Sequence, residues 1–161
     1  MKNSVAIIVF VCAVVGAGLV SGGSVSGQST PPGELAIFTD LALFSGNNQP
    51  MNCFTMNRFR AGQPVGFRVS VIDGATGQPA ADAEVVVHLT YGGKTVDVPA
   101  RYRGAGRGNL IPNLWTAKWV VPADAQTGVV MVTVTAMDKA GRSAEWKPFP
   151  NAASHLTIVN E

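Results

Sequence analysis

The sequence is poor in the residues that build metal cages and redox relays, since its 161 residues include two cysteines and two histidines. Charged residues make up 14% of the chain, and the net charge of +2 gives no electrostatic basis for nucleic-acid binding. The patterns G-x-S-x-G, H-E-x-x-H and C-x-x-C-H are all missing. These absences argue against hydrolase, zinc-protease and covalent haem chemistry, so we expect a non-enzymatic protein without a cofactor.

Residues 1–27 have the organisation of a secretory signal peptide. Lys2 precedes an uncharged apolar run, Val5–Val20, and small residues lead up to Gly27. We therefore predict cleavage near Gly27, with residues 19–22 as a second possible site. The alternative is a retained membrane anchor, but the run is shorter than the ~20 residues of a typical spanning helix. The predicted location is periplasmic, cell-surface or extracellular, with no membrane span after cleavage.

Cleavage at this point leaves Cys53 as the only cysteine of the exported chain. An intramolecular disulfide is then impossible, and we expect packing alone to hold the core.

Apolar and polar residues alternate with a period of two through most of the chain, which is typical of strands with one face on a core. The alternating segments are 65–71, 85–89, 115–119, 130–136 and 156–158. Turn residues separate them, including Asp73–Pro79 and the pair Gly92-Gly93. The pattern predicts an all-β fold: one antiparallel sandwich of about seven or eight strands over residues 58–161.

Residues 28–57 are interpreted as a lead-in segment before this sandwich. Leu35–Phe44 within it fits either helix or strand, and we favour a first strand because everything after it resembles strand. Trp115 and Trp119 alternate with polar neighbours on one predicted strand and are expected to fill the core.

Two stretches of the chain resemble a known family of modules. Ala61–Pro79 contains a strand and turn of the form G-x-x-V-x-F-x-V-x-V-x-D-x-x-T-G, and Trp115–Pro122 is followed by Thr127-Gly128 and Val130–Asp138. Together they are similar to bacterial immunoglobulin-like, macroglobulin-type modules of secreted proteins, over roughly residues 58–159. The resemblance implies an immunoglobulin-like sandwich that serves as a spacer, an adhesin or an accessory domain.

A basic, glycine-rich segment, Arg101–Asn109, is the first candidate binding surface. Arg101, Arg103 and Arg107 supply guanidinium groups for an anion, and Tyr102 is a candidate for stacking. It lacks the GK[ST] ending of a phosphate-binding loop. The alternative is a solvated loop kept polar to avoid aggregation.

Met51, Cys53 and Met56 form a set of soft ligands suited to Cu(I). A blue-copper site also needs two histidines, and nothing in the sequence places His88 or His155 near Cys53. The alternatives are methionines that fill gaps in the packing, or a covalent link from Cys53 to a partner.

Carbohydrate binding is a further possibility, because aromatic rings stack on sugars. The candidate platform comprises Trp115, Trp119, Trp146, Tyr91 and Tyr102.

Three other features are assigned to ordinary surface. Asp82 and Glu84 lie two apart in a predicted strand and are interpreted as a solvated edge, not as a glycosidase pair. His88 and His155 have no acidic neighbour in sequence.

The sequence therefore predicts a non-catalytic interaction module, an accessory or structural subunit of a periplasmic or cell-surface assembly. Its partner is expected to be a protein, bound through the end loops or by strand addition at an open sheet edge.

Overall fold

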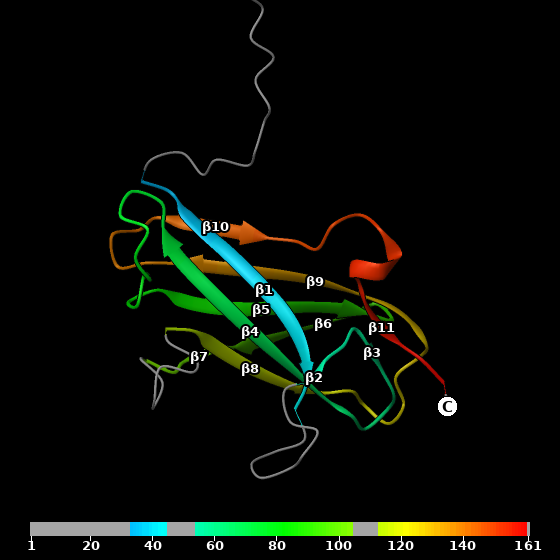
Figure 1. Cartoon of the computed structure of the whole chain (residues 1–161). Coiled ribbons are helices and arrows are strands. Elements are labelled where there is room, and N and C mark those ends of the chain that lie inside the picture. Colours follow the sequence, from blue (N-terminus) through cyan, green and yellow to red (C-terminus); the bar gives the residue numbers. More distant parts are fainter. Residues whose placement is uncertain (1–32, 45–53, 105–112, 161) are drawn as a thin grey trace, which may run out of the picture.

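The computed structural model describes residues 33–44, 54–104 and 113–160 (Figure 1). These residues form two β-sheets that share one hydrophobic core, with the short 3-10 helix η2 (Ala152–Ser154) before the last strand. The predicted all-β sandwich is confirmed. Among these residues, no helix has the length and apolar character needed to cross a membrane.

The first sheet has the strand order β2-β1-β4-β8-β7, and all its neighbouring strands are antiparallel. Its members are β2 (Phe54–Thr55), β1 (Leu35–Leu43), β4 (Pro64–Asp73), β8 (Trp115–Val120) and β7 (Arg101–Tyr102). The favoured strand at Leu35–Phe44 is thus confirmed as β1.

The second sheet has the order β3-β11-β9-β5-β6, and β10 pairs with the far end of β9. Its members are β3 (Arg58–Phe59), β11 (Leu156–Ile158), β9 (Gly128–Met137), β5 (Glu84–Tyr91), β6 (Lys94–Pro99) and β10 (Ser143–Trp146). The pair β3–β11 is parallel, whereas the other pairs are antiparallel.

The described part of the chain contains eleven strands, so the expectation of seven or eight was too low. The missed strands are β2, β3 and β7, with two residues each, and β10, with four. Segments this short carry too few residues to show alternation, and they exist because long-range neighbours pair with them.

The core lies between the sheets and follows the predicted alternation. Val65, Phe67, Val69 and Val71 of β4 are fully buried. Trp115 and Trp119 of β8 are only 1% and 7% exposed, which confirms that both tryptophans belong to the core.

Candidate functional site

The outer edge of β1 is largely uncovered by the described strands. β1 pairs with β4 along its whole length, from Leu35 to Leu43. On its other side it pairs with β2 at Ala42 and Leu43 alone. The first two thirds of β1 therefore have a strand on one side only.

The hydrogen bonds at the two ends of the β1–β4 ladder show which backbone groups this ladder uses. Gly74 N–H donates to the Glu34 carbonyl at 2.8 Å, and Phe44 N–H donates to the Pro64 carbonyl at 3.1 Å. Directly opposed residues of an antiparallel pair alternate between bonded and non-bonded. The even-numbered residues of β1 therefore point their N–H and C=O groups toward β4.

The odd-numbered residues point the other way. Met56 N–H donates to the Leu41 carbonyl at 3.2 Å on the side away from β4. The backbone groups of Leu35, Ile37 and Thr39 face the same side, and no described backbone group hydrogen-bonds to them there. They form a short row of unpaired donors and acceptors.

This row borders a hollow of about 630 Å³ that we call the edge groove. Residues 37–41 of β1 and residues 55–57 line it, and Trp146, Pro148 and Phe149 face them from the segment that starts in β10. A second hollow of about 680 Å³ continues the groove between residues 34–38 and 143–150. Figure 1 shows β1 in cyan beside β10 in orange, the arrangement that places the open edge next to this wall.

Two phenylalanines make the groove unusually apolar for a surface. Phe38 is 63% exposed and Phe149 is 70% exposed, and both line the groove. Met56 and Trp146 are half-buried and pack against the core from the same site. The Thr39 hydroxyl is buried with no hydrogen-bond partner among the described residues.

The charges around the edge groove are mostly paired. Arg68 Nε and Nη2 donate to the two carboxylate oxygens of Asp40 at 2.6 and 2.7 Å, a bidentate pair. Lys147 pairs with Glu145. The exposed Glu34 carboxylate, just before β1, has no partner among the described residues.

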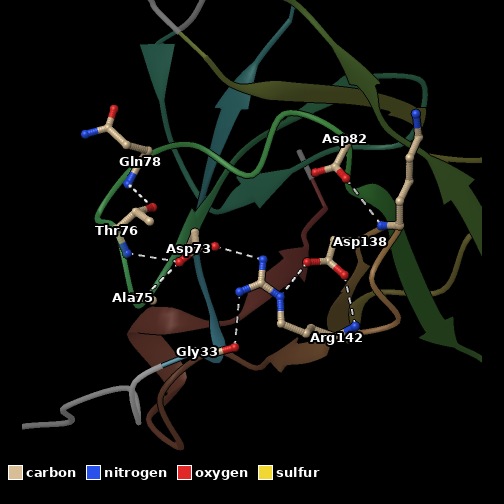
Figure 2. A network of polar contacts seen from close by, with 9 residues as sticks. Gly33, Asp73, Ala75, Thr76, Gln78, Asp82, Asp138 and Arg142 are labelled. Atoms are coloured by element: carbon tan, nitrogen blue, oxygen red, sulfur yellow. Dashed lines mark hydrogen bonds and ion pairs between the residues drawn. The ribbon is translucent and has the colours of Figure 1, made fainter.

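An arginine holds the strands that bound the groove in their relative positions (Figure 2). Arg142 Nε donates to Asp138 Oδ2 at 2.7 Å, and Arg142 Nη2 lies 2.8 Å from Asp73 Oδ2. Arg142 Nη1 also donates to the Gly33 carbonyl at 3.2 Å. One guanidinium thus connects the start of β1, the end of β4 and the turn between β9 and β10.

The same contacts set the ionisation of the two carboxylates. The Arg142 hydrogen bond lowers the pKa of Asp73, aided by the backbone N–H groups of Thr76 and Ala75. Burial raises the pKa of Asp138, whose side chain is 1% exposed, but the hydrogen bonds from Arg142 outweigh it and the net pKa is lowered. Both carboxylates are charged at neutral pH.

The predicted basic surface is described in part. Arg101 and Tyr102 form β7 at the far edge of the first sheet, and Arg107 lies outside the described residues. The Tyr102 ring packs on Trp115 with centroids 4.7 Å apart, and it is 37% exposed. Arg103 Nε donates to Thr116 Oγ1 at 2.7 Å. Tyr102 and Arg103 therefore have partners inside the fold.

The candidate soft-ligand set is also described in part, because Met51 and Cys53 lie outside the described residues. Met56 lines the edge groove. Thr157 N–H donates to the Asn57 carbonyl at 2.8 Å, so the chain brings His155 to the segment that contains Met56. No local pattern indicates this proximity, because it depends on the parallel β3–β11 pairing.

His88 has an acidic partner that sequence reasoning missed. Its Nδ1 lies 2.7 Å from Asp97 Oδ1, and its Nε2 lies 2.8 Å from Thr135 Oγ1. The two-residue turn after Tyr91 puts His88 opposite Asp97, so hairpin register was the available signal.

This line of three side chains has the order of partners of a catalytic triad and lies between paired strands. Thr135 pairs with Val86 on one side and with Glu145 on the other. Because Thr135 lies between these two ladders, its own N–H is not available to stabilise an oxyanion.

The expectation that Asp82 and Glu84 share a strand face is wrong. Glu84 begins β5, but Asp82 lies in the preceding turn, where its Oδ2 accepts a hydrogen bond from Lys139 N–H at 3.4 Å. Turn formation before the strand removes Asp82 from it, and both side chains are exposed, as the assignment to ordinary surface expects.

Comparisons with known proteins add no identification. No family model matches the sequence, and no curated protein matches it either.

Proposed function

We propose that the chain is an exported, non-catalytic interaction module that acts as an accessory or structural subunit of a periplasmic or cell-surface assembly. The observation that carries this proposal is the open edge of β1, which borders an apolar groove with the exposed rings of Phe38 and Phe149. Unprotected edges and clustered exposed apolar side chains are hazards for a protein that acts alone. They are expected where a partner covers them.

Four further observations support the proposal. The N-terminal residues resemble a signal peptide, and the sequence resembles immunoglobulin-like modules of secreted bacterial proteins. The described residues contain no group of three or more His, Cys, Asp or Glu side chains placed to hold a metal ion. The triad-like arrangement at His88 ends on Thr135, whose backbone N–H lies between two paired strands and is not available to an oxyanion.

Site-specific photo-crosslinking in intact cells tests the proposal. A photoreactive phenylalanine analogue replaces Phe38 or Phe149 in the edge groove, and Met131 serves as the control. Met131 is similarly exposed at 58% but lies on β9, away from the groove. We expect the same protein to be crosslinked from both groove positions and not from Met131.

The crosslinked partner is then purified, and its affinity is measured for the wild type and for Phe38→Ser. We expect the variant to bind at least about tenfold more weakly, because truncated aromatic anchors at the centre of an interface cost ~2 kcal/mol or more. Equal crosslinking from all three positions, or from none, would contradict the proposal.

The basic surface at Arg101, Tyr102, Arg103 and Arg107 is the second candidate interface. The same analogue at Arg101, which is exposed on β7, distinguishes the two surfaces. A partner crosslinked from Arg101 and not from Phe38 would move the interface to this edge.

A second candidate function is copper handling by Met51, Cys53 and Met56. The observation that favours it is the proximity of His155 to this segment, together with a His155 Nδ1 that is buried without a hydrogen-bond partner among the described residues. Anaerobic Cu(I) titration against a competing chelator tests it. Identical curves for the wild type, Cys53→Ser and Met56→Leu would discard it.

A further inference from the structure

We infer that the edge groove binds an extended peptide segment of the partner protein, which adds to the first sheet as a new strand beside β1. This inference rests on the proposed function and specifies how the partner is recognised and what its recognised segment contains.

The unpaired backbone of β1 selects an extended ligand. The N–H and C=O groups of Leu35, Ile37 and Thr39, with which no described residue pairs on this side, recur at every second residue, about 7 Å apart in a strand. An extended peptide presents donors and acceptors with the same spacing, whereas a helix uses its own groups internally. The row is long enough to pair with about five residues of a partner strand.

The lining of the groove selects the side chains of that strand. Side chains of a strand alternate between its two faces, so every second residue of the ligand would face the wall formed by Trp146 and Pro148. Apolar residues fit these positions because Ile37, Leu41, Met56, Trp146 and Pro148 make most of this side of the groove apolar. The intervening residues lie beside Phe38 on the solvent side.

The charge at the start of β1 selects a basic residue in the ligand. Asp40 is neutralised by Arg68, but the Glu34 carboxylate has no partner among the described residues. A lysine or arginine at the end of the peptide that lies beside Glu34 provides the missing positive charge.

A second copy of this chain fits the site less well than a foreign strand. Its own β1 edge would bring a second Glu34 carboxylate to a site whose negative charge has no described partner. We therefore assign the groove to a peptide segment with alternating apolar residues and a basic end.

The test uses the purified chain and a fluorescent seven-residue peptide, Lys-Val-Thr-Val-Thr-Val-Thr, measured by fluorescence anisotropy. Two further peptides carry N-methyl groups, one on the valine amides and the other on the threonine amides. In a paired strand, only one of these sets of N–H groups faces β1. We expect one methylated peptide to bind at least about tenfold more weakly and the other to bind within about threefold of the parent, since each hydrogen bond contributes ~1 kcal/mol.

Two variants of one residue provide the matched control in the protein. Thr39→Pro removes an N–H that the β1–β4 ladder does not use, and prolines of this kind are tolerated at sheet edges. Thr39→Val keeps the N–H. We expect loss of peptide binding with Thr39→Pro and retention with Thr39→Val. If Thr39→Pro does not fold, the pair of methylated peptides decides alone.

The remaining measurements separate the possible outcomes. Amide chemical shifts should move at Leu35, Ile37 and Thr39, and a peptide with Glu in place of Lys should bind about threefold more weakly. Equal affinity of both methylated peptides, or no binding by any peptide, would overturn strand addition, while crosslinking from Phe38 and Phe149 would still support the proposed function. A dimer that Thr39→Pro dissociates would make a second copy the occupant and overturn the inference.

Discussion

The substitution Thr39→Val in strand β1 is expected to stabilise the protein, although it replaces the native residue. The Thr39 hydroxyl is buried beside the edge groove and has no hydrogen-bond partner among the described residues. Valine has nearly the same shape and the same β-branching, so the strand geometry does not change. Only the unpaired polar atom is replaced, by a methyl group.

The magnitude follows from two contributions. An unsatisfied buried polar group costs about 1–3 kcal/mol, and burying one more methyl group contributes about 0.8 kcal/mol. The net change in the free energy of unfolding is smaller than the sum of these two contributions. The unfolded state compensates part of it, and the hydroxyl can rotate in the folded state. We expect the free energy of unfolding to rise by about 1 kcal/mol, which raises Tm by roughly 4 °C for a domain of this size.

Urea denaturation followed by tryptophan fluorescence measures the change, with Trp115 and Trp119 as buried reporters. The matched control is Thr116→Val. In the native protein the Thr116 hydroxyl accepts a hydrogen bond from Arg103 Nε at 2.7 Å. This control should lower the free energy of unfolding by about 1 kcal/mol. The m-value should be the same for all three proteins, because the surface exposed on unfolding is unchanged.

A decrease in the free energy of unfolding with Thr39→Val would refute this prediction. If Thr39→Val destabilises the protein as much as Thr116→Val does, the Thr39 hydroxyl has a partner and this side of the groove is polar. The apolar positions assigned to the bound strand would then have to be revised.

Two further predictions concern the ion pairs of Arg142 and the hydrogen bond of Trp115 in the core. Because Arg142 lowers the pKa of Asp73 and Asp138, their contribution to stability is present above their unfolded pKa near 4 and is lost as the pH falls through their lower folded values. Urea titrations between pH 2 and 7 should show this loss, and Arg142→Met should weaken the pH dependence; an unchanged profile would contradict the assignment. Trp115→Phe removes the Nε1–H that donates to the Ala83 carbonyl at 3.1 Å, and it should lower the free energy of unfolding by about 1–3 kcal/mol. A change below about 0.5 kcal/mol, typical of surface positions, would show that the bond is dispensable.

Much of the local structure could be read from the residue pattern alone. Alternation located the long strands and identified Trp115 and Trp119 as core residues, because a strand with one buried face imposes a period of two. The turn after Tyr91 determines the register that joins His88 to Asp97, so even this missed pair was encoded locally. Turn chemistry also encodes Asp73, which caps its own loop through the backbone N–H groups of Ala75 and Thr76.

The candidate site, in contrast, was decided by tertiary structure. The residues of Leu35–Phe44 fit helix or strand, so they indicate neither that Leu35 and Ile37 are buried nor which strands flank them. The edge stays open because β10 pairs with β9 in the other sheet, and because β2 is only two residues long. Strand neighbours depend on pairings between residues far apart in sequence, and these follow from the packing of the whole core and not from any local pattern. The sequence therefore determined that the protein is built of strands with one buried face, and only the assembled sandwich determined which edge is left for a partner.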